Sequence, residues 1–257
     1  MSSAKVHHLP VRAKRPSTLA TEPPLTQRIA LVSGANRGIG LEVAKQLAAL
    51  GITVFMGMRE LGKGEKALKA VRGLGGDAFP VKLDVTKPRD IEAVIAQIEG
   101  KFGRLDILIN NAGGYYDHSG KSTDGDLTSI RGALDVNLLG AWSLTAAALP
   151  LMRRHGYGRV VNVSSECAVH AMCGEKAPAY RISKAALNAY TQVIARETQG
   201  SGILINAVCP GWTATDLGGA GGRPVAESAE GVVWAALVSE QEAGTGDFYR
   251  DRARIAW

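Results

Sequence analysis

The sequence predicts an α/β fold in which a single domain is built on a doubly wound parallel sheet with helices on both faces. Short apolar runs rich in β-branched residues alternate along the chain with longer segments whose apolar residues recur every three or four positions. The run Ile29-Ala30-Leu31-Val32 has no polar residue, which is typical of a strand buried on both faces. A length of 257 residues and a hydrophobic fraction of 46% suffice for one large core and exclude disorder of the whole chain.

The order of these segments indicates where a ligand would bind. Strands alternate with helical segments in a βαβ pattern, and right-handed crossovers between parallel strands place a ligand at the carboxyl ends of the strands. We expect strands at residues 29–33, 53–57, 78–83, 105–109, 159–164 and 203–208, and helices at residues 38–50, 88–102, 130–154 and 180–199. Neither an internal repeat nor a second domain is visible.

The first 27 residues differ in composition from the rest of the chain. Lys5, Arg12, Lys14 and Arg15 stand there against one acid, Glu22, so this stretch holds half of the formal net charge of +6. Because it also lacks apolar periodicity, we expect a basic, disordered tail at residues 1–27 and a folded domain at residues 28–257. The charge left in the domain is too weak to indicate a nucleic-acid partner.

The expected location is the cytoplasm. Three cysteines, an odd number, do not form a disulfide framework and favour a reducing compartment. The tail lacks the apolar core of a secretory signal, although its acid-poor composition leaves an organelle transit peptide as an alternative. The most apolar stretch, residues 138–152, is too short for a membrane span and holds Pro150, so we expect no membrane partner.

A glycine-rich turn joins the first expected strand to the first expected helix. Glycines let the backbone turn tightly and approach a pyrophosphate, while free N–H groups at the helix start complement its charge. A tight turn without a ligand is the alternative, but the position at the head of a βαβ unit favours a dinucleotide and a Rossmann-type domain. The sequence therefore predicts cofactor contacts from Gly34, Asn36, Arg37, Gly38, Ile39 and Gly40.

The end of the second expected strand indicates which dinucleotide is bound. A carboxylate at that point would bind a ribose 2′-hydroxyl and repel a 2′-phosphate. The chain has Met58-Arg59 there and Arg37 in the first turn, and two guanidinium groups can pair with a phosphate. We therefore predict NADP(H) over NAD, with two alternatives: either arginine is a solvated surface charge, or Glu60 takes the strand-end position.

A tyrosine and a lysine four residues apart are the candidate acid and its electrostatic partner. On a helix, Tyr180 and Lys184 share a face, so the ammonium lies beside the phenol. A nearby positive charge is expected to lower the pKa of the phenol and to let it exchange a proton near neutral pH. Taken alone, such a pair is more often an ordinary pair on a helix surface. Only together with the glycine turn does it indicate a catalytic role.

Several further motifs occur in the order of a known family. They are Asn110-Asn111-Ala112-Gly113, Asn137, Val163-Ser164-Ser165, Tyr180-Arg181-Ile182-Ser183-Lys184, Cys209-Pro210-Gly211-Trp212 and Thr215-Asp216. With them, residues 28–257 resemble the short-chain dehydrogenase/reductase family, and the C-terminal motifs resemble its carbonyl-reductase-like branch. Two departures are Ser33, where the family more often has Thr, and a segment between Ser165 and Tyr180 that is longer than usual.

The resemblance and the residues together imply an NADPH-dependent oxidoreductase that reduces a ketone, aldehyde or quinone to an alcohol. Tyr180 would protonate the carbonyl oxygen during hydride transfer, and Ser165 would donate a hydrogen bond to the same oxygen. By resemblance, Asn137 would hold a water that links Lys184 to solvent, and a homo-oligomer is possible. The resemblance further implies cofactor contacts from Asp84, Val85, Asn111, Ala112, Gly113, Tyr180, Lys184, Pro210, Gly211, Thr213 and Thr215.

Three other functions compete with this interpretation. The first is an alcohol dehydrogenase working in the oxidative direction, the second a catalytically silent nucleotide-sensing protein, and the third an adaptor that binds through its basic tail. A metal site at Cys167, His170 and Cys173 is not expected, because the spacing fits no common zinc pattern. The substrate pocket is expected at residues 114–126, 167–178 and 214–225, the last a Gly-rich candidate for a mobile lid.

Overall fold

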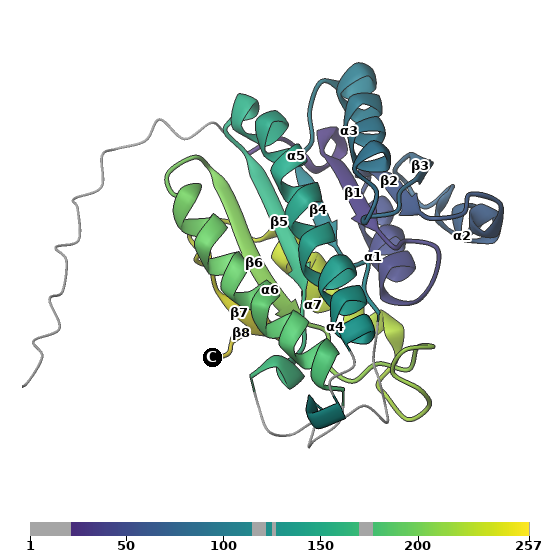
Figure 1. Ribbon diagram of the computed structural model, residues 1–257. Coiled ribbons are helices and arrows are strands. Elements are labelled where there is room, and N and C mark those ends of the chain that lie inside the picture. The colour runs from purple at the N-terminus through teal and green to yellow at the C-terminus, as the bar shows by residue number, and fades with distance from the viewer. Residues whose placement is uncertain (1–21, 115–121, 125–126, 170–176, 257) are drawn as a thin grey trace, which may run out of the picture.

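The computed structural model describes residues 22–114, 122–124, 127–169 and 177–256. They form an eight-stranded sheet of order β3-β2-β1-β4-β5-β6-β7-β8 (Figure 1). Neighbouring strands pair in parallel, except β7 and β8, which are antiparallel. The strands are β1 (Ile29–Ser33), β2 (Thr53–Met58), β3 (Ala78–Lys82), β4 (Ile107–Asn110), β5 (Gly158–Val163), β6 (Ile203–Cys209), β7 (Phe248–Arg250) and β8 (Ala253–Arg254). The predicted α/β class and doubly wound sheet are confirmed.

Helices cover both faces of the sheet. The α-helices are α1 (Gly38–Ala49), α2 (Glu65–Val71), α3 (Pro88–Phe102), α4 (Leu127–Leu134), α5 (Ala141–His155), α6 (Pro178–Glu197) and α7 (Val225–Leu237). Helices α5 and α6 lie in front of the sheet in Figure 1, with α1 and α7 behind it. Apolar residues of α1, α2 and α7 form one core with the sheet, and those of α3, α5 and α6 form the other.

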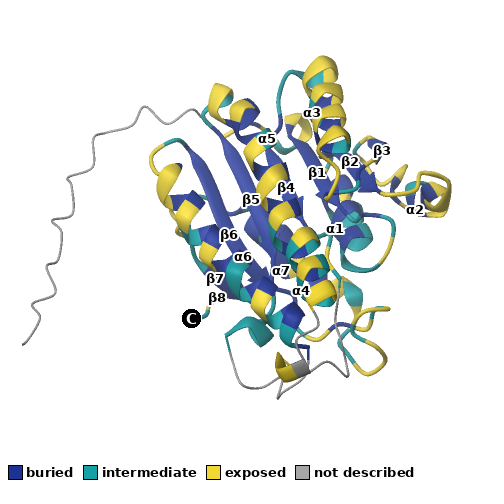
Figure 2. Ribbon diagram, viewed as in Figure 1, coloured by how far each residue is buried: buried dark blue, intermediate teal, exposed yellow. Residues whose placement is uncertain are grey.

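Strand β1 shows how the two cores are built. Ala30 and Val32 pack into the core beside α1 and α7, whereas Ile29 and Leu31 pack into the core beside α3 and α5. Successive side chains of a strand point to opposite faces, so a strand covered on both sides must be apolar at every position. The central strands are accordingly buried along their length, whereas exposed residues lie on the outer sides of the helices and in the loops (Figure 2).

The long apolar helix predicted at residues 130–154 is divided in the structure. Helix α4 passes into a π-helical stretch, Asp135–Gly140, and then into α5. The stretch Leu127–His155 is long enough to cross a membrane, and an 18-residue window within it has a mean hydropathy of 1.3. However, α5 contributes Leu144, Ala148 and Met152 to a core that it shares with α3 and α6, which makes it a core helix of this fold.

Four elements were absent from the predicted set, namely α2, α7, β7 and β8. Helix α7 packs against both the sheet and α1, so it is apolar over most of its surface and lacks a clear polar face. Strands β7 and β8 have only three and two residues, too few for a period to be recognised.

Residues 22–27, which the composition assigns to the tail, make defined contacts in the structure. The carboxylate of Glu22 pairs with Arg28 at 3.1 Å and with Arg159 at 2.6 Å, and a 3-10 helix spans Leu25–Gln27. Glu22 therefore lies against the domain, although the composition had placed it in the tail. Residues 1–21 of the expected tail lie outside the described residues.

Candidate active site

The candidate catalytic and cofactor residues gather at one edge of the sheet, where the parallel strands end. Ser33 is the last residue of β1, Asn111 follows β4, Ser165 lies just beyond β5 and Pro210 follows β6. Since β1, β4, β5 and β6 are neighbours in the sheet, residues far apart in the sequence meet along this edge. This is the edge at which an open α/β sheet binds its ligand.

The hydroxyl of Ser33 ties the glycine turn to the segment after β4. It accepts hydrogen bonds from the N–H groups of Asn111 and Ala112, each at 3.0 Å, and donates one to the carbonyl of Ile109 at 3.1 Å. The side-chain amide of Asn111 donates in return to the carbonyl of Ser33 at 2.9 Å. These contacts need a hydroxyl at position 33 but no methyl group, so Ser replaces Thr without loss of a bond.

The turn itself is kept clear of side chains. Gly34 and Gly38 have φ angles of +67° and +54°, in the left-handed region that favours glycine. A Cβ atom on Gly40 would lie 2.4 Å from Nδ2 of Asn111 and 2.5 Å from the carbonyl oxygen of Gly34. Helix α1 begins directly after Arg37, so its free N–H groups face the turn. The residues present therefore fit the pyrophosphate of a dinucleotide.

Tyr180 and Lys184 share a face of α6, as their spacing predicts, and both are buried. Lys184 Nζ lies 5.8 Å from the ring centroid of Tyr180 and donates a hydrogen bond to the carbonyl of Val163 at 2.7 Å. A Cβ on Gly113 would lie 3.4 Å from the same ammonium, so the backbone of the segment after β4 passes close to it. The ammonium, the phenol ring and the Gly113 backbone thus form one compact group.

Asn137 joins this group from the π-helical stretch. Its Oδ1 accepts a hydrogen bond from the N–H of Gly114 at 3.0 Å, and its Nδ2 donates to the carbonyl of Gly114 at 3.0 Å and to Ser183 Oγ at 2.9 Å. Ser183 Oγ donates in turn to the carbonyl of Tyr180 at 2.7 Å. Both hydrogens of the amide are therefore used within the protein.

One known protein family has a model that matches most of this chain. The family model of the short chain dehydrogenases matches residues 28–223. The chain belongs to the short-chain dehydrogenase family. Membership in this family of oxidoreductases accounts for the order of the motifs and for the sheet.

The relatives of this short-chain dehydrogenase include several reductases. It is 34% identical over 194 residues to the ketoacyl reductase HetN of Nostoc sp., a match that covers 74% of this chain and 65% of HetN. It is 34% identical over 195 residues to a 3-oxoacyl-(acyl-carrier-protein) reductase of Synechocystis sp., covering 75% of this chain and 77% of that protein. A solved structure of NADPH-bound carbonyl reductase from chicken fatty liver superposes with a TM-score of 0.79 and 30% identity, covering 90% and 99% of the two chains.

In this short-chain dehydrogenase, burial shifts the titration of the buried lysine. Removal from water lowers the pKa of Lys184 from 10.5 to about 8, and the charge of Cys209 opposes this only partly. A lysine whose folded pKa is depressed binds its proton more tightly when unfolded. Its charge therefore costs stability below pH 8, and the cost is relieved as the pH rises from about 8 to 10.5.

We expect Lys184→Met to be more stable than the wild type at pH 7, by about 3 kcal/mol, because it removes a buried charge. The difference should shrink between pH 8 and pH 10.5. The check is the free energy of unfolding in urea at several pH values, with Lys66→Met, an exposed lysine of α2, as the control. If the difference in free energy of unfolding stayed constant across that pH range, it would contradict the lowered pKa of Lys184.

Ser165 lies at the head of a short 3-10 helix, Glu166–Ala168, and its Oγ accepts a hydrogen bond from the N–H of Cys167 at 3.2 Å. The sulfur of buried Cys209 accepts from the N–H groups of Glu166 at 3.3 Å and Gly211 at 3.4 Å. Cys209 thus connects the segment that carries Ser165 to the turn after β6. Cys167 is disulfide-bonded, which the odd cysteine count did not suggest.

Asp84 and Val85, two of the predicted cofactor contacts, follow β3, next to the end of β2. Burial raises the pKa of Asp84, but hydrogen bonds from Thr86 and the charges of Arg59 and Lys87 outweigh it, so the pKa lies below its usual value. Thr86 donates to Asp84 through both its N–H and its hydroxyl. Val85 is buried and packs closely on Gly140. Arg59 is exposed at the end of β2.

Arg37, the other arginine predicted to contact the cofactor, is ion-paired with Asp216. Both side chains are mostly exposed, at 67% and 73%. Thr215 lies beside the first turn, 3.5 Å from the position that a Cβ of Gly38 would take. The segment after β6 therefore reaches across the carboxyl edge to the glycine turn.

Pro210, Gly211 and Thr213 are the other cofactor contacts predicted in the segment after β6. In the structure they face the rest of the protein. Pro210 is buried, and its carbonyl accepts a hydrogen bond from Nε of Arg223. Gly211 has a φ angle of +76°. The hydroxyl of Thr213 is buried between the carbonyl of Gly211 and Ser228. Thr213 therefore shapes this segment in the structure, and its hydroxyl is already engaged.

Sequence reasoning did not assign a role to Ser183 or Asp216, although both lie within the quoted motifs. Ser183 stands one residue before Lys184, and Asp216 directly follows Thr215. Their partners, Asn137 and Arg37, come from distant segments, so only the fold reveals the contacts. Asn36 and Ile39 are half-buried in the first turn. Much of the expected substrate pocket, including residues 115–121, 125–126 and 170–176, lies outside the described residues.

Proposed function

We propose that this short-chain dehydrogenase is an NADPH-dependent reductase of ketones, aldehydes or quinones. The observation that carries the proposal is the convergence of Tyr180, Lys184 and Asn137 on the segment after β4, beside the glycine turn that fits a pyrophosphate. Relatives named ketoacyl and 3-oxoacyl reductases support a carbonyl as the reacting group. The likeness to NADPH-bound carbonyl reductase supports both the reaction and the cofactor.

The residues of this chain have distinct roles in the proposal. A bound nicotinamide supplies the hydride. Tyr180 donates the proton to the carbonyl oxygen, and Ser165 steadies that oxygen by a hydrogen bond. Lys184 places a positive charge near the phenol, which favours its release of a proton. Asn137 and Ser183 position α6 and the segment after β4, so that the phenol meets the substrate at a fixed distance.

Two arginines support NADPH over NADH. Arg59 lies exposed at the end of β2, next to Asp84, and Arg37 opens α1. A 2′-phosphate bound between them would have two guanidinium partners, whereas the hydroxyl of NADH would gain little from either.

The test is turnover across a panel of ketones, aldehydes, quinones and 3-oxoacyl thioesters, followed by the loss of NADPH absorbance. We expect turnover with at least one carbonyl class and a clear preference for NADPH over NADH at equal concentration. Tight NADPH binding without turnover of any substrate would favour a nucleotide-sensing protein. A preference for NADH would overturn the cofactor assignment alone.

The pair of Arg37 and Asp216 gives a separate prediction. A 2′-phosphate must compete with the Asp216 carboxylate for Arg37, so Asp216→Asn should tighten NADPH binding. The gain should be a few-fold, since an exposed ion pair contributes about 0.2–1 kcal/mol. Binding of NADH, measured by the same titration, should not change because it lacks the phosphate. Equal changes in the binding of NADPH and NADH would show that Asp216 acts only on the shape of the segment after β6.

A further inference from the structure

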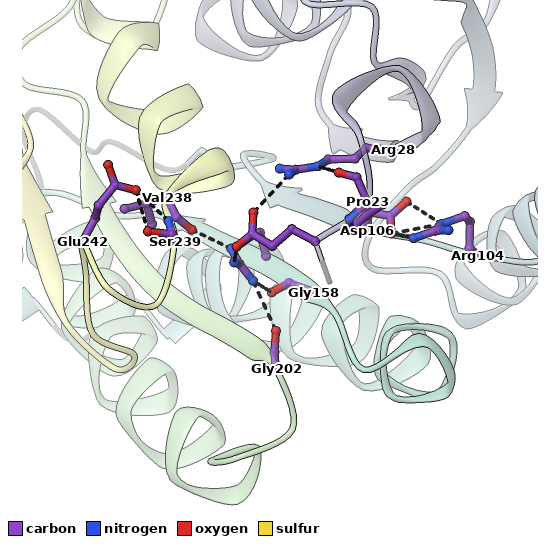
Figure 3. A network of polar contacts seen from close by, with 11 residues as sticks. Pro23, Arg28, Arg104, Asp106, Gly158, Gly202, Val238, Ser239 and Glu242 are labelled. Atoms are coloured by element: carbon purple, nitrogen blue, oxygen red, sulfur yellow. Dashed lines mark hydrogen bonds and ion pairs between the residues drawn. The ribbon is translucent and has the colours of Figure 1, made fainter. Parts of the chain in front are cut away.

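A second polar cluster lies at the opposite edge of the sheet, where the parallel strands begin. Arg28 directly precedes β1, and Arg159 is the second residue of β5. The carboxylate of Glu22 lies between them, with Oε1 at 2.6 Å from Arg159 Nη2 and Oε2 at 3.1 Å from Arg28 Nη2. Each carboxylate oxygen is thus bound by a different guanidinium. Figure 3 shows this cluster with Arg28, Asp106 and the surrounding backbone.

Arg159 is fixed in place by backbone carbonyls. Its Nε donates to Val238 at 2.7 Å, and its Nη1 donates to Gly158 at 2.9 Å and to Gly202 at 3.2 Å (Figure 3). The side chain is 1% exposed, so carbonyl dipoles replace water around it without cancelling its charge. Burial lowers the pKa of Arg159, which indicates that the protein environment disfavours its charge.

The ring of Tyr157 completes the cluster. Its centroid lies 4.4 Å from the guanidinium carbon of Arg159 and 5.0 Å from that of Arg28. Burial raises the pKa of Tyr157, although the two arginines oppose the shift, so the phenol is neutral at physiological pH. Tyr157 therefore offers its ring face to both cations but no negative charge.

The nearby acids do not replace Glu22. Asp106 is fully buried and accepts hydrogen bonds from the N–H of Ile29 and from Arg104. Glu240 attracts Arg159 but forms no ion pair with it among the described contacts. Within the described residues, Arg28 Nη1 and the hydroxyl of Tyr157 are buried without a hydrogen-bond partner. The cluster thus has more buried donors and positive charge than its fixed acceptors satisfy.

We infer that Arg28, Arg159 and Tyr157 form a carboxylate-binding site, here called the carboxylate socket, and that its resident ligand is Glu22 of the same chain. Arg28 and Arg159 each bind a different oxygen of one carboxylate, and three backbone carbonyls hold Arg159 in position for it. The socket anchors the segment before β1 to the edge where the strands begin. Removing the ligand leaves two buried guanidinium groups without an ion-pair partner, a situation that strongly destabilises proteins.

The test is chemical rescue of the full-length chain. Glu22→Ala removes the atoms that acetate can supply, so we expect a lower urea midpoint that rises again, saturably, with added acetate. Sodium chloride at the same ionic strength should not restore it. Glu92→Ala, an exposed glutamate of α3, is the control and should show neither the loss nor the acetate response.

Glu22→Gln adds an independent measurement, because it keeps the shape and loses the charge. It should also lower the midpoint, and acetate should help it less since the amide fills the space. If Glu22→Ala does not fold unaided, refolding yield in acetate against chloride gives the same comparison. A wild-type midpoint for Glu22→Ala, or equal responses to acetate and chloride, would overturn the inference. None of these readouts depends on the proposed reductase activity.

Discussion

Tyr180→Phe is expected to lower turnover by about 10²- to 10⁴-fold while NADPH binding stays close to that of the wild type. The substitution deletes the phenolic proton donor, and general acids contribute rate factors of this size. The ring remains buried on α6, with Lys184 Nζ 5.8 Å from its centroid, so the packing of the site is kept. The measurements are steady-state kinetics with the best carbonyl of the panel and a fluorescence titration of NADPH.

A matched control lies on the same helix. Tyr190 is also buried, and its ring stacks on Trp142 at a centroid distance of 4.5 Å. Tyr190→Phe makes the same chemical change away from the carboxyl edge and should keep wild-type turnover. Retained turnover in Tyr180→Phe would refute the role of the phenol, and loss in both variants would point to a general effect on α6.

The second large effect is expected for Gly40→Ala in the first turn of α1. The added Cβ would lie 2.4 Å from Nδ2 of Asn111 and 2.5 Å from the carbonyl oxygen of Gly34. One of these groups must move, which costs about 1–3 kcal/mol of stability and shifts the turn that would hold the pyrophosphate. We expect NADPH affinity to fall by at least tenfold, measured by titration, together with a lower urea midpoint.

Gly100→Ala in α3 is the control for helix propensity. A Cβ on Gly100 would have no atom within 4 Å, so the change should stabilise the protein by about 0.5–1 kcal/mol and leave NADPH binding unchanged. Wild-type affinity in Gly40→Ala would show that the turn adapts to a side chain and that its glycine is not required.

The sheet could be predicted from the sequence because its strands are buried on both faces. In β1, residues that enter opposite cores are all apolar, so a continuous apolar run is a direct consequence of the layered structure. The division of the helix at residues 135–140 could not be predicted in the same way. A π-helical turn adds no apolar period of its own, so the stretch Asp135–Gly140 resembles the helices on either side in sequence.

Contacts of the site between residues close in the sequence could be predicted. Contacts between residues from different segments that meet at the sheet edge could not. Tyr180 and Lys184 are one helical turn apart, so their common face follows from the sequence. The contact between Arg37 and Asp216 joins segments that are 179 residues apart in the sequence, and Asp216 could not be distinguished from a solvated acid beforehand. Glu22 was placed in the tail for the same reason.

The position of Glu22 also bears on how the protein can be attached to a surface. Its anchor lies where the strands begin, while the candidate active site lies where they end, and the six residues of β5 between these edges cover roughly 20 Å. A support or a fluorescent carrier coupled just before residue 22 would therefore be held at the edge where the strands begin. The cofactor edge would face the solution, so immobilised protein should exchange substrate and product freely.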